Sequence, residues 1–179
     1  GDLGRVSGGK AAKLSDLAKA DGPTVIVGVL GASPVIDGLV RTGKLKVGDL
    51  AGQWEGFRQV VVERPLANVP RALVIVGADR RGAVYGAYDL SERIGVSPWA
   101  WSADVPVARK ADLFLTAGAR ADHPRVKYRG FFINDEDPAF SGWAKKTFGG
   151  INADLYAQLI RGIADGRRSG AILLFVGPP

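Results

Sequence analysis

The stretch ALVIVGADRRGAVYGAYDLSERIG, residues 72 to 95, decides the fold. Its first part, residues 72–79, is an apolar run of the kind that forms a buried strand. The small and apolar positions that follow repeat at helical spacing: Val84, Ala87, Tyr88, Ser91 and Ile94. Gly95 stands where such a helix would end, because glycine readily adopts the conformation of a C-terminal cap. A strand that runs directly into a helix predicts an α/β or α+β protein.

The same alternation extends toward the N-terminus. TVIVGVLG (24–31) is a continuous apolar run, which predicts a strand buried on both faces. Ser33 and Pro34 have the residue types of an N-cap and a first helical position, and we expect this helix to close at Gly43. FRQVVVERP (57–65) predicts a strand that its proline ends.

Toward the C-terminus the alternation resumes after a segment rich in Trp and Pro. DLFLTAG (112–118), VKYRGFFIND (126–135) and AILLFVGPP (171–179) predict strands. GWAKKTFGGINAD (142–154) is expected to be a polar, glycine-bearing connection. LYAQLIRGIAD (155–165) predicts a helix with these residues on one face: Leu155, Leu159, Ile160 and Ile163.

The composition limits the class of protein without identifying it. The 179 residues, 46% of them hydrophobic, suffice for one domain, or for one domain and part of another. The net charge of +6 comes from scattered Lys and Arg residues, so we expect no nucleic-acid partner. The chain has no Cys for a disulfide, and it has no run of about 20 apolar residues that could cross a bilayer. It also has no Met, even at position 1, which favours a start inside a longer precursor.

Two glycine-bearing turns invite comparison with nucleotide-binding loops. In VGVLGAS, Gly28 and Gly31 do not have the G-x-G-x-x-G spacing that lets a backbone approach a pyrophosphate. In VGADRRGAVYG, Gly77 and Gly82 have P-loop spacing, but Ala83 stands where that loop needs a lysine. Tight turns from strand to helix explain both stretches, so a nucleotide-binding domain is the weakest alternative.

His123 and the acidic run NDED (134–137) are the remaining candidates for chemistry. His123 is the only histidine, and no G-x-S-x-G elbow accompanies it, so we expect an exposed loop residue. A metal site needs clustered His, Cys or carboxylate ligands, and NDED holds the only dense carboxylates. A divalent ion at NDED is therefore an alternative, but a site without metal is favoured.

FFINDEDP (131–138) ends a strand-like run on an amide and three carboxylates. In barrel enzymes the loops after the strands form the active-site face. Neighbouring residues on an extended backbone point to opposite sides, so one strand cannot supply both members of a glycosidase acid and base pair. From the residues alone, NDED also fits a cap for the next segment or an exposed turn.

Long blocks of the chain, rather than short motifs, resemble a known family. The blocks are VIVGVLGASPVIDGLVRTGKL, ALVIVGADRRGAVYG, RGAVYGAYDLSERIGVSPWAWSADVP and VKYRGFFINDEDPAFSGWAKKTFGGINADLY. In this order they resemble glycoside hydrolase family 115, the xylan α-1,2-glucuronidases. The likeness covers residues 2–156.

The resemblance implies an N-terminal α/β domain followed by a (β/α)8 catalytic barrel. Residues 1–118 would form most of the first domain, with a boundary near 118–125, and residues 119–179 would open the barrel with VKYRGFFINDE as its first strand. The implied enzyme is an inverting glycosidase without an organic cofactor. Its substrates would be glucuronoxylan or aldouronic oligosaccharides. Since the sequence after residue 156 departs from the family and holds at most two barrel strands, we expect a fragment that is inactive alone.

The resemblance also assigns candidate site residues. Asp135 and Glu136 would be catalytic or substrate-orienting carboxylates, and the candidates for substrate binding are Asn134, Glu92, Trp99 and Arg129. Asn134 would hydrogen-bond a sugar hydroxyl, and Arg129 would offer its fork to a uronate carboxylate. For Glu92, Trp99 and Arg129, the structural alternatives are a surface helix residue, a domain-interface residue and a residue of the strand framework.

An alternative from another class is a non-catalytic carbohydrate-binding or interaction module with Trp54, Trp99 and Trp101 as stacking platforms. Enzymes that attack plant xylan are usually exported, so the resemblance implies a secreted or periplasmic location. It implies no membrane partner, and it leaves a homodimer open.

Overall fold

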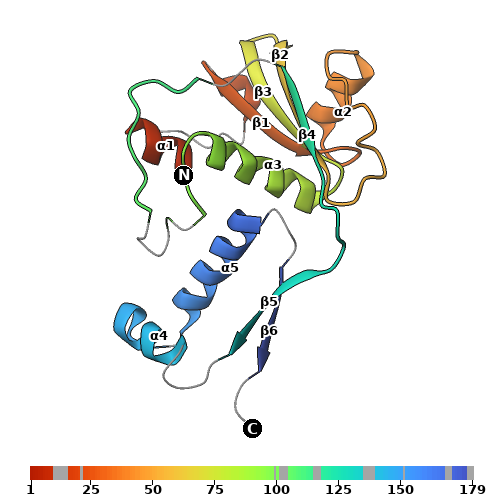
Figure 1. Cartoon of the computed structure of the whole chain (residues 1–179). Coiled ribbons are helices and arrows are strands. Elements are labelled where there is room, and N and C mark those ends of the chain that lie inside the picture. The colour runs from red at the N-terminus through yellow and green to blue at the C-terminus, as the bar shows by residue number, and fades with distance from the viewer. Residues whose placement is uncertain are drawn as a thin grey trace. The chain divides into compact units, whose positions relative to one another are not determined.

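The structure is a computed structural model that describes residues 1–9, 16–20, 22–98, 100, 105–114, 118–134, 140–150, 152–167 and 171–176. The chain forms two compact units: an N-terminal unit of residues 1–96 and 107–124, and a C-terminal unit of residues 97–106 and 125–179. Each unit contains a sheet and helices (Figure 1). The predicted mixed α/β class is confirmed.

The N-terminal unit is built on a four-stranded mixed sheet (Figure 1). Its strands, in the order in which they pair, are β1 (Thr24–Val29), β3 (Val69–Gly77), β2 (Phe57–Leu66) and β4 (Ala119–Asp122). The strands β1 and β3 run parallel, whereas β2 runs antiparallel to both β3 and β4. Two short helical segments, α1 (Asp2–Ser7) and η1 (Leu17–Lys19), precede the sheet in the chain.

Helix α2 (Pro34–Arg41) covers one face of this sheet. Its Ile36 and Leu39 are buried in a core cluster with these strand residues: Ile26, Val62, Ala72, Val74 and Val76. Ser33 occupies the N-cap position and Pro34 follows it, as predicted. However, the Ser33 hydroxyl oxygen accepts a hydrogen bond from the backbone N–H of Val29 at 2.9 Å. The serine therefore ties the end of β1 to the start of the helix.

Helix α3 (Arg80–Arg93) covers the opposite face, and glycines let it lie close to the strands. A Cβ on Gly86 would lie 2.5 Å from Cγ2 of Ile75, and one on Gly82 would lie 2.0 Å from the carbonyl oxygen of Gly56. The residues of α3 that are buried are Gly82, Ala83, Tyr85, Gly86, Asp89 and Leu90. The predicted stripe is only partly right: Val84 is 47% exposed and Ile94 is buried, whereas the buried face of α3 combines small residues with Tyr85 and Leu90. The predicted helix end is confirmed, since Gly95 has φ 103° and donates its N–H to Glu92 O at 2.9 Å.

Three strand predictions for this unit need correction. The strand β1 is not buried on both faces: it lies at the edge of the sheet and Val27 is 50% exposed. The strand β2 continues through Pro65 to Leu66, because an irregularity in its pairing between Glu63 and Leu66 accommodates the proline. In the predicted strand 112–118, residues 112–114 and 118 form no strand and residues 115–117 lie outside the described residues, whereas the polar segment after residue 118 contains β4. The domain boundary near residue 118 remains a prediction.

The C-terminal unit contains two parallel strands joined through two helices. They follow in the order β5 (Arg129–Asn134), α4 (Phe140–Phe148), α5 (Ala153–Arg167) and β6 (Ala171–Val176). The strand β5 pairs with β6 from Arg129 opposite Ala171 to Asn134 opposite Val176. The strands predicted at both places are confirmed. Among the described residues this unit has no further strands, so the predicted barrel is not visible in them.

The segment predicted as a polar connection is largely helix α4. It contains Ala144 and two lysines, which are good helix formers, and it stops where Gly149 and Gly150 adopt φ values of 75° and 131°. The next helix, α5, begins beside Asn152, whose Oδ1 accepts a hydrogen bond from the N–H of Leu155 at 2.9 Å. Leu155 and Leu159 of the predicted apolar face are buried, but Ile160 is 52% exposed.

No helix in the described ranges is both long enough and apolar enough to span a bilayer.

Candidate active site

The carboxyl end of β5 is the position from which the predicted catalytic run starts. Asn134 is the last residue of β5, and its partner Val176 is the last residue of β6. The carboxyl ends of two parallel strands therefore meet at one edge of this sheet, which is the edge where open α/β sheets and barrels bind their ligands. Asp135 and Glu136 follow directly, and both lie outside the described residues.

Arg129 lies at the opposite end of the same strand. It is the first residue of β5 and Asn134 is the last, so at about 3.3 Å per residue the two backbone positions are about 17 Å apart. The role predicted for Arg129 stays a prediction. The structure thus puts both residues on one strand but does not bring them together.

The other predicted residues belong to different parts of the chain. Glu92 is an exposed residue of α3 in the N-terminal unit, where its charge acts on Arg120. Trp99 and Trp101 lie outside the described residues, and Trp54 is 38% exposed. His123 is exposed, as predicted, and one of its ring nitrogens lies 3.1 Å from the carbonyl oxygen of Pro124.

The structure reveals a buried polar network that the sequence did not indicate. Asp89 on α3 is fully buried, and its carboxylate accepts two hydrogen bonds of 3.0 Å from Nε and one of 2.8 Å from Nη2 of Arg120 on β4. Gln59 on β2 donates to the same carboxylate at 2.9 Å. The hydrogen bonds from Arg120 to Asp89 raise the pKa of Arg120 above its ordinary value, although partial burial acts against this rise.

A second polar cluster lies at the start of α3. Asp79 caps the helix, because its Oδ1 accepts the N–H of Gly82 at 2.8 Å. Its Oδ2 accepts the N–H of Glu55 at 2.7 Å, and Glu55 is a buried residue with a left-handed φ of 56°. The Glu55 carboxylate is paired with Arg81 at 2.8 Å. One carboxylate therefore caps the helix and holds a strained loop residue in place.

Replacing Asp79 tests these two roles separately. Asp79→Ala removes both acceptors, and we expect the free energy of unfolding to fall by about 1–2 kcal/mol. Asp79→Asn keeps an acceptor for the helix cap but presents an NH₂ group to the N–H of Glu55, so we expect a smaller loss. Urea unfolding followed by far-UV circular dichroism measures both. Equal losses in the two variants would show that the cap contributes nothing.

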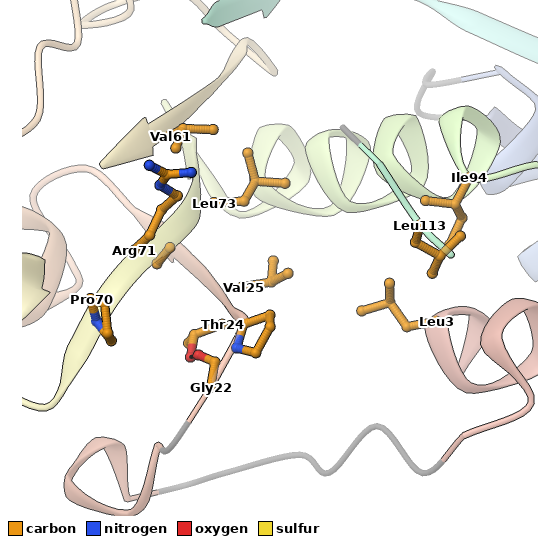
Figure 2. A pocket seen from close by; sticks show the side chains of 12 residues that line it. Leu3, Gly22, Thr24, Val25, Val61, Pro70, Arg71, Leu73, Ile94 and Leu113 are labelled. Carbon is orange, nitrogen blue, oxygen red and sulfur yellow. Dashed lines mark hydrogen bonds between the residues drawn. The ribbon is translucent and has the colours of Figure 1, made fainter. Parts of the chain in front are cut away.

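An apolar cavity of about 590 Å³ lies within the N-terminal unit. Val25, Leu73 and Val61 stand opposite one another on β1, β3 and β2 and line it from the sheet. Figure 2 shows Leu3, Ile94 and Leu113 together at one end of the cavity and Pro70 and Arg71 at the other.

The lining of this cavity does not suit hydrolysis. Among the residues that the structure describes, those lining it include no carboxylate and no histidine. Its Thr24 hydroxyl already donates to Gly22 O at 2.7 Å, and the Arg71 guanidinium is paired with Glu63 at 2.6 Å. Acid and base catalysis needs a group that exchanges a proton within hydrogen-bond reach of the substrate, and the described lining residues offer no carboxylate or histidine for this role.

The described residues also hold no cluster of three or more His, Cys, Asp or Glu side chains that could bind a metal ion. The acidic run after Asn134 is outside that search. The prediction of a site without metal therefore stays a prediction.

The described residues define an α/β protein in which the parallel strand β5 precedes an acidic run in the sequence. Comparison with known proteins identifies the class of enzyme that it resembles. The sequence profile "Glycosyl hydrolase family 115" matches residues 121–163. A solved structure described as "A novel family GH115 4-O-Methyl-alpha-glucuronidase, BtGH115A, with specificity for decorated arabinogalactans" matches with a TM-score of 0.76 at 27% identity. The match covers 96% of this chain and 22% of that one. None of the curated proteins compared with the chain matches it.

The profile match over residues 121–163 and the structural match over 96% of the chain support membership of glycoside hydrolase family 115, at partial coverage. The resemblance stated from the sequence is thereby confirmed. The chain spans 22% of the length of the structure that it matches, so the activity of a whole protein is a matter for proposal.

Proposed function

We propose that the chain is part of an enzyme that hydrolyses the bond between glucuronic or 4-O-methylglucuronic acid and a plant polysaccharide. The observation that carries this proposal is the extent of the profile match, because residues 121–163 include the whole of β5 and the acidic run that follows it. The structural relative, described as a 4-O-methyl-α-glucuronidase, supports the same reaction.

The proposed mechanism is an inverting displacement that uses two carboxyl groups. One protonates the oxygen of the departing sugar, and the other removes a proton from the attacking water. These groups must stand roughly 6.5–9.5 Å apart to leave room for the water. Since Asp135 and Glu136 are neighbours, we assign one of them to this pair or to orienting the substrate, and the partner carboxyl to a segment outside this chain.

Two polysaccharides are candidate substrates, and each has its own support. The family resemblance implies the α-1,2-linked side chains of glucuronoxylan and the aldouronic oligosaccharides made from it. The structural relative is described as specific for decorated arabinogalactans. Either substrate fits a secreted or periplasmic enzyme that needs no organic cofactor.

Incubating the longer protein that contains this chain with each substrate tests the proposal. We expect glucuronic or 4-O-methylglucuronic acid to be released from one of them, detected by anion-exchange chromatography. The same assay with residues 1–179 alone should show no release, because these residues span 22% of the length of the structural relative. Binding of either polysaccharide by the longer protein without any release would instead favour a non-catalytic binding module.

A further inference from the structure

The strand β4 has little in its own sequence to determine how it pairs. Its four residues, ARAD, are all exposed. It forms four pairs with β2, from Phe57 opposite Asp122 to Val60 opposite Ala119. A short strand that buries neither face specifies its register weakly, because a shift exposes no apolar side chain that was covered before.

One side chain of β4 differs from the others. Arg120 stands opposite Gln59, and its guanidinium reaches the fully buried carboxylate of Asp89 on α3 with three hydrogen bonds of 2.8–3.0 Å. The Arg120 side chain is 46% exposed, so only its inner end is bound.

Gln59 connects the same carboxylate to the rest of the sheet. Its Nε2 donates to Asp89 at 2.9 Å and to the carbonyl oxygen of Gly86 at 2.8 Å, and its Oε1 accepts from Arg93 at 2.7 Å. Gln59 is 1% exposed. The carboxylate of Asp89 is therefore held at a fixed place between β2 and α3, and Arg120 of β4 supplies the positive charge that pairs with it.

Only the observed register gives Asp89 this counter-charge. A shift of β4 by one residue would move Arg120 to the other face of the sheet, and a shift by two would move it about 7 Å along β2. Either shift would leave a buried carboxylate without its arginine, which is among the more costly defects in a folded protein. The exposed pair Glu63–Arg71, by comparison, is solvated on both sides and has no such effect.

We propose that the ion pair of Asp89 and Arg120 determines the register of β4 on β2. This inference does not depend on the proposed enzymatic function. It bears on that function because six residues, 123–128, separate β4 from β5, the strand that precedes the acidic run. A change of register would alter the length of chain that remains to connect the two strands.

The absence of cysteine makes disulfide trapping in residues 1–179 a clean test. Val60→Cys with Ala119→Cys reports the observed register, because these residues are direct partners. Val60→Cys with Ala121→Cys reports a shift by two residues, because diagonal neighbours are about 7–8 Å apart and cannot bridge otherwise. In the otherwise unchanged chain we expect only the first pair to cross-link under mild oxidation.

Replacing the ion pair should change this pattern. In an Asp89→Leu/Arg120→Leu background we expect the ratio of the observed to the shifted cross-link to fall about tenfold or more, the factor that corresponds to losing roughly 1.4 kcal/mol of discrimination. Arg120→Gln should lower the ratio in the same direction, and Arg120→Lys, which keeps the charge, should lower it less. The control Glu63→Gln/Arg71→Gln should leave it unchanged.

A role in stability alone would not move this ratio. If Asp89→Leu/Arg120→Leu and Arg120→Gln fold, as judged by far-UV circular dichroism, and both retain the original ratio, the proposal is wrong. If the double variant does not fold, the cross-link ratio of the single variant Arg120→Gln tests the proposal. We expect this variant to fold, because the altered side chain is half exposed and lies on an edge strand.

Discussion

Of the two variants Asp135→Asn and Glu136→Gln in the longer protein, at least one is expected to release glucuronic acid about 10²- to 10⁴-fold more slowly. The reason is that a positioned acid or base contributes a factor of this size to a proton transfer. Both substitutions preserve the shape of the side chain and remove its ability to exchange a proton. Initial rates on aldouronic oligosaccharides and on decorated arabinogalactan measure the effect.

Asp154→Asn is the matched control for these variants. Asp154 is an exposed carboxylate in the first turn of α5 and lies within the residues that match the family profile. Its replacement should leave the rate within about twofold, as expected for a surface substitution away from a site. If Asp135→Asn and Glu136→Gln both stay in that range too, the acidic run has no part in the mechanism.

Gly82→Ala is expected to destabilise the N-terminal unit by about 3 kcal/mol. The added Cβ would lie 2.0 Å from the carbonyl oxygen of Gly56, and a backbone atom cannot move aside as the end of a flexible side chain can. The helix α3 would have to shift away from the sheet, and overpacking of this kind typically costs 1–3 kcal/mol or more. The midpoint of urea unfolding, followed by far-UV circular dichroism, reports the change.

Gly38→Ala provides the comparison for Gly82→Ala. Gly38 also lies in a helix, α2, but a Cβ there would meet no heavy atom within 4 Å. Since alanine is the better helix former, we expect this variant to be about 0.5–1 kcal/mol more stable. A Gly82→Ala variant as stable as Gly38→Ala would refute the close packing of α3 on the sheet.

The alternation of strand and helix was predictable because it depends on local patterns. The β3 and α3 pair and the cap at Gly95 follow from runs of residues that are adjacent in the chain. The buried side of α3 was not predictable in the same way, since the close approach at Gly82 and Gly86 depends on Gly56 and Ile75 in other elements. A search for large apolar residues at helical spacing misses a helix face on which glycines and an alanine are buried beside Tyr85 and Leu90.

The position of β1 at the edge of the sheet shows a similar limit. An apolar run such as TVIVGV has the composition of a strand covered on both faces, but only the order of strands decides how much of it is covered. The same holds for α4, where glycines and polar residues concealed a helix that ends at Phe148, just before Gly149.

In the candidate site too, features that depend on neighbouring residues were predictable, and features that depend on distant residues were not. The strand before the acidic run follows from the sequence and is confirmed by β5, although the predicted strand began at residue 126 and β5 begins at Arg129. The network around Asp89 was missed because its members come from three elements, and Asp89 and Arg120 are separated by 31 residues. The local sequence shows only an aspartate within a helix. The spacing of the apolar residues does not tell whether that aspartate is buried, as Asp89 is, or exposed on the surface.

A crystal structure of the longer protein with glucuronic acid bound tests the central claim most directly. The account predicts that the sugar lies beyond the carboxyl end of β5, with a carboxylate oxygen of Asp135 or Glu136 within about 2.6–3.2 Å of a sugar oxygen or of the water at the anomeric carbon. A sugar bound elsewhere, with both carboxylates turned into bulk solvent, would contradict it.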